Sequence, residues 1–176
     1  MKNKQKSFTL IEVLIYIAVL AIIILAVSAF FLWAIRSNVK TKAMREVLDN
    51  TRRAMEIMTY EIREAKSVYT PTSIFDSHPG QLSLEIKRYL PAGETITYID
   101  FYLCGSQLCL KKESQNPIAL TSDRVEISSL IFSQVATTST IPSIQINLKV
   151  NYKAPAQKPE YQASFTATST ASLRSY

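Results

Sequence analysis

The stretch VLIYIAVLAIIILAVSAFFLWAI, residues 13–35, contains no charged residue and decides the fold of the N-terminal part of the chain. A helix over this stretch measures roughly 35 Å, which is enough to cross a hydrocarbon core of about 30 Å. A secretory signal peptide that is removed has a shorter apolar segment, of about 7–15 residues, followed by a small-residue cleavage site. Here the run passes directly into Arg36. We therefore expect a helix that spans a membrane.

The charges around this segment leave its orientation in the membrane open. Basic residues lie on both sides of it: Lys2, Lys4, Lys6, Arg36, Lys40, Lys42 and Arg45. The positive-inside rule compares such flanks, and here they nearly balance. The whole chain has 20 Lys and Arg against 14 Asp and Glu, a formal charge of +6, and half of this excess lies in the first seven residues. The basicity is therefore weak support for a nucleic-acid partner.

Glu12 is a carboxylic acid at the edge of the apolar stretch. A charged side chain at the centre of a membrane span costs about 2.5–3.5 kcal/mol, and less near the interface. Two interpretations follow from this position alone. Either Glu12 lies at headgroup depth and reaches water, or it has a cationic partner.

The sequence around Glu12, KSFTLIEVLIYIAVLAIIILAV (residues 6–27), resembles the prepilin N-terminal motif of type IV pilins and type II secretion pseudopilins. That motif has a short basic leader, a small residue, a Phe that becomes the new N-terminus, and a Glu at the fifth mature position. The resemblance implies that a prepilin peptidase cleaves between Ser7 and Phe8 and N-methylates Phe8. It also implies that Glu12 pairs with the Phe8 amine of a neighbouring subunit. Two features depart from the family: Ser7 replaces the usual Gly, and the apolar helix lacks the proline of many major pilins.

Over residues 36–68 the apolar side chains recur every three or four positions, which is typical of an amphipathic helix. The positions of this stripe are Val39, Met44, Val47, Leu48, Thr51, Ala54, Met55, Met58, Ile62 and Ala65. Because no Gly or Pro interrupts residues 8–70, we predict one continuous helix of about 60 residues, ending near Pro71. The C-terminal part of the chain must cover the stripe.

The rest of the chain alternates between apolar and polar residues in runs typical of β-strands. The runs cover residues 82–89, 95–103, 108–112, 125–134, 143–152 and 161–171. We predict a pilin-like α+β fold in which an antiparallel β-sheet, arranged as a meander, packs on the long helix. The expected organisation is a leader (1–7), a membrane-spanning assembly helix (8–35), an amphipathic helix (36–70) and a β-rich globular domain (71–176).

The two cysteines and the single histidine are too few for a structural zinc site built from one chain. Cys104 and Cys109 flank a predicted four-residue hairpin loop, which would place them opposite each other and within reach of a disulfide. Outside the cytoplasm a disulfide is favoured, and free thiols are the alternative. A redox-active pair lacks CxxC spacing and a basic residue between the cysteines. His78 lies in a predicted loop (71–80) and is expected to be a solvated surface residue.

Residues 52–65, the strand-turn-strand pattern before Pro117 and the closing residues 165–174 resemble J-type minor pseudopilins and PilW-type minor pilins. This resemblance implies a minor subunit that is not an enzyme and needs no cofactor. Its partners would be other pilin or pseudopilin subunits, the prepilin peptidase, an inner-membrane assembly platform and, before assembly, membrane lipid. The expected location is the cytoplasmic membrane, with a single span and the C-terminal domain outside the cytoplasm.

Two alternatives belong to other functional classes. A DNA-capture subunit of a competence pilus would need a basic patch with interleaved aromatic residues, although such runs are usually solvated strand faces. The residues available for it are Lys87, Arg88, Tyr89, Tyr102, Lys111 and Lys112. The other alternative is a plain single-pass anchored protein or a tethered enzyme. Against an enzyme, the sequence shows no nucleophile motif, no metal-ligand spacing and no Gly-rich loop, with 3 glycines in all.

Overall fold

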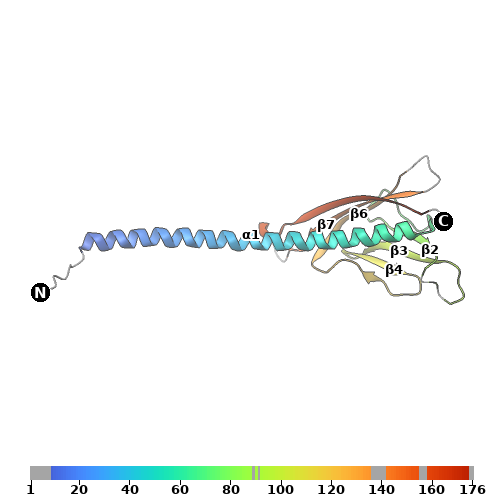
Figure 1. Cartoon of the computed structure of the whole chain (residues 1–176), viewed down its shortest axis with the longest axis horizontal. Helices are drawn as coiled ribbons and strands as arrows, with labels where there is room; N and C mark the ends of the chain where they lie inside the picture. Colours follow the sequence, from blue (N-terminus) through green and yellow to red (C-terminus); the bar gives the residue numbers. More distant parts are fainter. Residues whose placement is uncertain (1–8, 89, 91, 136–141, 155–157, 175–176) are drawn as a thin grey trace. The chain divides into compact units, whose positions relative to one another are not determined.

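A computed structural model describes residues 9–88, 90, 92–135, 142–154 and 158–174, and the statements below refer to these residues. The chain divides into two compact units, Met1–Val39 and Lys40–Tyr176. The helix α1 (Leu10–Glu64) contributes to both (Figure 1). This confirms a long continuous helix, but the predicted end near residue 70 is wrong. Beyond Glu64 the backbone pairs instead with β2 (Leu82–Ile86), because the Lys66 N–H donates to the Glu85 carbonyl and the Tyr69 N–H to the Ser83 carbonyl.

In the first unit, α1 carries apolar side chains on every face. All the large hydrophobic residues from Leu10 to Ile35 are exposed, from 45% at Val13 to 84% at Leu10. By length and composition, α1 is the one helix of the described residues that could cross a membrane. Exposed apolar surface on this scale needs lipid or other apolar helices around it.

In the second unit, one face of α1 is buried. Its buried residues are Ala43, Val47, Thr51, Ala54, Met55, Met58, Glu61 and Ile62. The predicted stripe is therefore confirmed for most of its members, but Leu48 is 37% exposed.

Two antiparallel sheets pack along this half of α1 (Figure 1). The first has the order β1-β2-β3-β4-β5, with β1 (Ser67–Val68), β2 (Leu82–Ile86), β3 (Thr97–Cys104), β4 (Gln107–Lys112) and β5 (Ile118–Ala119). The second has the order β6-β7-β8, with β6 (Val125–Val135), β7 (Ser143–Tyr152) and β8 (Ser164–Ser172). All six predicted runs contain a strand, but the prediction of a single meander is wrong, because the strands form two separate sheets. The loop after β5 is bonded to α1 through the Ser122 N–H, so β6 begins a new sheet.

Both sheets and α1 share one hydrophobic core. The alternation predicted for residues 143–152 is confirmed, since Ile144, Ile146, Leu148 and Val150 are all fully buried. The largest fully buried side chains are Phe101 on β3, Phe132 on β6 and Met58 on α1. The fold is thus the predicted pilin-like α+β architecture, with a long helix packed against antiparallel sheets.

The loop before β2 lies along the edge of β6. The Asp76 N–H donates to the Phe132 carbonyl over 2.8 Å and the Gly80 N–H to the Leu130 carbonyl over 2.9 Å. His78 is exposed, as predicted, but it is more than a solvated residue, because its Nδ1 accepts the Leu130 N–H at 3.1 Å. The loop therefore covers part of an edge that would otherwise be open.

We expect Gly80→Ala to lower the free energy of unfolding by about 1–3 kcal/mol, the usual cost of overpacking. A Cβ at this position would lie 2.9 Å from the Leu130 carbonyl oxygen and 3.2 Å from the Phe132 ring. Urea unfolding of the detergent-solubilised protein, followed by near-ultraviolet circular dichroism, measures this. Ser77→Ala, an exposed position in the same loop, is the control. Equal midpoints for the two variants would contradict the packing argument.

Candidate functional site

The start of α1 holds the candidate site, and the local sequence explains its geometry. Thr9 precedes the helix, and its carbonyl accepts the Val13 N–H at 3.3 Å. The Glu12 N–H donates to the Thr9 carbonyl at 3.1 Å and lies 3.4 Å from the Thr9 Oγ1. Thr9 is thus the N-cap and Glu12 the third helical residue, the spacing of a capping box. A carboxylate in the first turn also complements the helix dipole.

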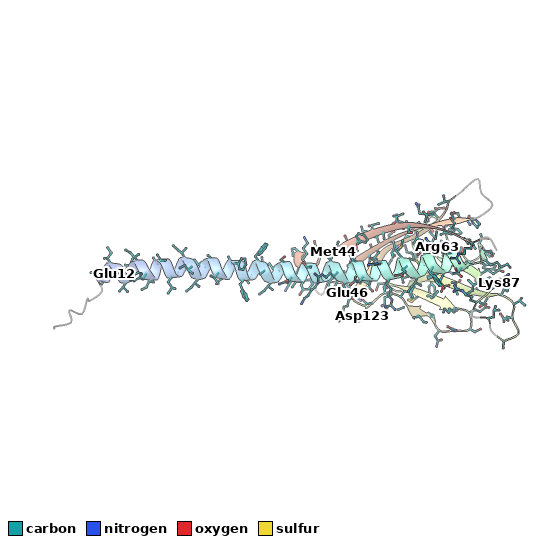
Figure 2. The ribbon with its side chains drawn as sticks, in the orientation of Figure 1. Glu12, Met44, Glu46, Arg63, Lys87 and Asp123 are labelled. Atoms are coloured by element: carbon teal, nitrogen blue, oxygen red, sulfur yellow. A yellow bond between two sulfur atoms is a disulfide. The ribbon has the colours of Figure 1, made fainter. Side chains whose placement is uncertain are left out.

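The carboxylate of Glu12 accepts a hydrogen bond from the hydroxyl of Tyr16, at 3.2 Å from Oε1 (Glu12 is labelled in Figure 2). Tyr16 lies four residues further along the same helix face and is 57% exposed. The sequence interpretation identified Glu12 but missed Tyr16. The signal that could have found it is the i, i+4 spacing, which brings two helical side chains together.

Residues 2–28 match the model of the prokaryotic N-terminal methylation motif. The chain carries a type IV pilin-like prepilin leader. The matched segment includes the predicted processing residues Ser7 and Phe8, which lie outside the described residues, and also Glu12 and Tyr16. Together with the single N-terminal apolar helix, the motif fits a membrane-anchored pilin-like or pseudopilin-like protein that assembles with other such subunits. No curated protein and no solved structure matches the chain.

The residues considered for a DNA-binding patch lie in different surroundings, as far as the structure describes them. Lys111 is exposed and Lys112 half-buried, because successive residues of β4 point to opposite faces. Arg88 is engaged with the helix, where its Nη2 lies 2.9 Å from the Glu61 Oε2. Tyr89 lies outside the described residues. The DNA-capture interpretation therefore stays a prediction.

Glu61 is a buried acid on α1, and the sequence interpretation did not single it out. Its side chain is 7% exposed, and that of Arg88 is 33% exposed. Arg88 also donates to the Tyr60 hydroxyl at 2.9 Å and lies 5.1 Å from the centre of the Tyr60 ring. Burial raises the pKa of the Glu61 carboxyl above its usual range, while the positive charges of Arg88 and Lys112 offset part of this rise. The pair connects the last turns of α1 to the segment after β2.

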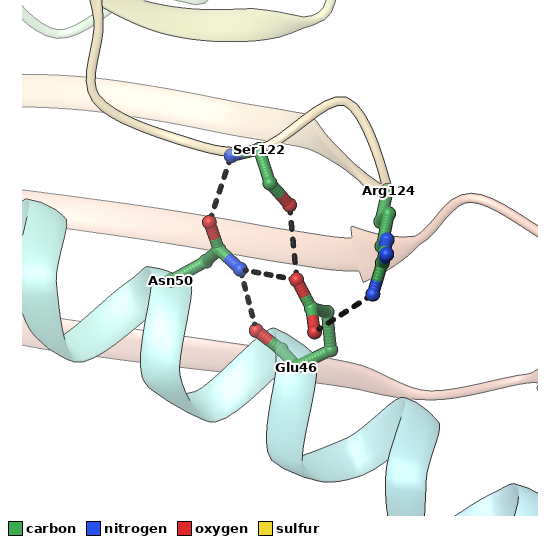
Figure 3. A network of polar contacts seen from close by, with 4 residues as sticks. All are labelled: Glu46, Asn50, Ser122 and Arg124. Carbon is green, nitrogen blue, oxygen red and sulfur yellow. Dashed lines mark hydrogen bonds and ion pairs between the residues drawn. The ribbon is translucent and has the colours of Figure 1, made fainter.

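A second polar network connects α1 to the loop before β6 (Figure 3). Glu46 Oε1 accepts from the Ser122 hydroxyl at 3.1 Å and from Asn50 Nδ2 at 3.3 Å. The Asn50 Oδ1 accepts the Ser122 N–H at 2.8 Å, and Arg124 lies 3.9 Å from the second Glu46 oxygen. Glu46, Asn50 and Ser122 border a hollow of about 340 Å³, which Asp49 and Arg53 also line. Because the polar atoms bond mainly to one another, the network holds the loop in place.

Cys104 and Cys109 form a disulfide across the β3–β4 hairpin, with their Cα atoms 5.9 Å apart. The predicted four-residue loop is wrong, because Cys104 pairs with Gln107 and the turn is only Gly105-Ser106. Gly105 has φ +69°, which a two-residue hairpin turn with Gly first requires. Cys109 therefore lies opposite Tyr102, and the disulfide joins diagonal neighbours on one face of the hairpin.

Proposed function

We propose that this chain is a minor pilin or pseudopilin subunit that a prepilin peptidase cleaves between Ser7 and Phe8. The cleaved subunit would assemble into a type IV pilus or a type II secretion pseudopilus. The observation that carries the proposal is the methylation motif over residues 2–28, which leads into a helix with exposed apolar side chains on every face. The minor role rests on the resemblance of residues 52–65 and 165–174 to J-type and PilW-type subunits.

In the processed chain, the Phe8 amine and the Glu12 carboxylate would both lie near the start of the helix, and assembly would depend on these two groups. Cleavage creates an amine on Phe8, and N-methylation leaves that amine able to carry a positive charge. Glu12 of one subunit then pairs with the Phe8 amine of its neighbour. In a low-dielectric environment, loss of one partner of such a pair costs about 3–5 kcal/mol. The pair therefore favours one axial stagger of neighbouring helices over others.

Each part of the chain would act in a different place. The apolar part of α1 spans the cytoplasmic membrane before assembly, and the second unit lies outside the cytoplasm. An assembly platform extracts the helix into a filament of parallel subunits. The exposed apolar side chains from Leu10 to Ile35 support this, because they suit both lipid and a bundle of similar helices.

Mass spectrometry of the protein purified from its native host tests the proposal. We expect residues 1–7 to be absent and Phe8 to carry a methylated amine. A host strain without the prepilin peptidase is the control, and it should yield the full-length precursor. If residues 1–7 remain attached in the wild-type host and the N-terminus is unmodified, the chain is a plain single-pass anchored protein and the proposal fails.

A further inference from the structure

We propose that Tyr16 is a positioning residue for Glu12: its hydroxyl holds the carboxylate in the conformation that receives the amine of the neighbouring subunit. This inference rests on the proposed function and adds a residue to it. The observation behind it is the hydrogen bond of 3.2 Å from the Tyr16 hydroxyl to Glu12 Oε1.

The geometry of an α-helix favours this contact between Tyr16 and Glu12. Long side chains on a helix lean towards its N-terminus and cover the preceding turn, so Tyr16 lies over the turn that contains Glu12. The main chain of Glu12 is fixed from the other side, because its N–H donates to the Thr9 carbonyl at 3.1 Å. Glu12 is therefore held at its backbone by Thr9 and at its carboxylate by Tyr16.

The neighbours of Glu12 in the sequence explain why a hydroxyl matters at this position. Ile11, Val13 and Ile15 offer no side-chain donor, and a carboxylate among apolar groups without a donor is costly. A carboxylate has about four acceptor positions, so one bond from Tyr16 leaves room for an ammonium group. A carboxylate already held in place loses less conformational entropy when the amine arrives.

A different role for Tyr16 makes a different prediction. Tyrosine is enriched at membrane interfaces, where its ring lies at headgroup level, so Tyr16 could act only as an interfacial anchor. An anchor would act whatever residue stands at position 12. A positioning residue acts only while the Glu12 carboxylate is present.

The test compares Tyr16→Phe on two backgrounds in the full-length chain, expressed in its native host. The readout is the ratio of the subunit in sheared filaments to the subunit in membranes, measured by quantitative mass spectrometry. We expect Tyr16→Phe to lower this ratio about fivefold, the effect of losing one hydrogen bond. On a Glu12→Gln background, the same change should cause no further decrease. Cleavage after Ser7 should be unaffected, and Tyr102→Phe, a matched change in the second unit, should leave the ratio unchanged.

Two results would overturn the inference while leaving the proposed function intact. One is a Tyr16→Phe variant that is incorporated as well as the wild type. The other is an equal decrease on both backgrounds, which identifies an interfacial anchor. If the wild-type chain itself is neither processed nor incorporated, the proposed function fails, and this inference fails with it.

Discussion

Glu12→Ala is expected to leave membrane insertion intact and to lower incorporation into filaments by about 100-fold or more. The reason is that the Phe8 amine of the neighbouring subunit would be left in an apolar environment without its carboxylate. Removing one partner of a buried ion pair costs about 3–5 kcal/mol, which corresponds to at least two orders of magnitude in an equilibrium. The ratio of filament to membrane subunit, measured after shearing the cells, reports this loss.

Two further variants separate charge from shape. Glu12→Gln keeps the size of the side chain and an acceptor for Tyr16, but it removes the negative charge, so a decrease close to that of Glu12→Ala is expected. Ile11→Ala changes a neighbouring exposed apolar side chain and should have little effect. Normal incorporation of Glu12→Ala would refute the pairing role.

Arg88→Ala is expected to lower the free energy of unfolding at neutral pH by about 3 kcal/mol, the lower end of the range for breaking a buried pair. It leaves the Glu61 carboxylate, which is 7% exposed, without the guanidinium that lies 2.9 Å away. Partial exposure of Arg88 and the remaining charge of Lys112 keep the loss at this lower end. Urea unfolding of the solubilised protein measures the change, and Lys87→Ala, an adjacent exposed cation, is the control.

The pH dependence of this variant provides a second check. Burial raises the pKa of Glu61, so its charged form destabilises the fold above that pKa, and stability is regained as pH falls through it. Without Arg88 the pKa of Glu61 rises further, and the carboxyl becomes neutral at a higher pH. The stability difference between Arg88→Ala and wild type should therefore shrink from neutral to mildly acidic pH. The stability lost in Arg88→Ala should also be mostly recovered in the double variant Arg88→Ala/Glu61→Gln. A stability difference that grows on acidification would contradict this role of Glu61.

Periodicity was sufficient to predict the main elements of the fold. The alternation over residues 143–152 and the three- and four-residue spacing along α1 both correspond to buried faces in the structure. The end of α1 was missed because residues 65–70 contain no helix-breaking residue. There the pairing of β1 with β2 overrides local helix propensity. The strands β1 and β5 have two residues each, too few to show any period.

The candidate site was predictable where a residue differed in chemical character from its neighbours in the sequence. Glu12 is conspicuous as an acid beside an apolar run, whereas Tyr16 passes as one more large side chain within it. Glu61 was visible in principle, since it lies on the same helix face as Met58 and Ile62. Its partner Arg88 is distant in the sequence, so only the folded chain could show that the charge is paired.

The exposed apolar surface of α1 from Val13 to Ile35 has a consequence for how reversibly the subunit would assemble. Leucine and isoleucine are solvated about equally well by acyl chains and by the side chains of other apolar helices, so exchanging one environment for the other releases little free energy. If the chain assembles as proposed, its apolar side chains alone would favour neither the filament nor the bilayer. The growth and shortening of such a filament would then depend on work done by the assembly machinery and on a few polar contacts such as the Glu12 pair. The apolar helices could slide past one another at little cost in free energy.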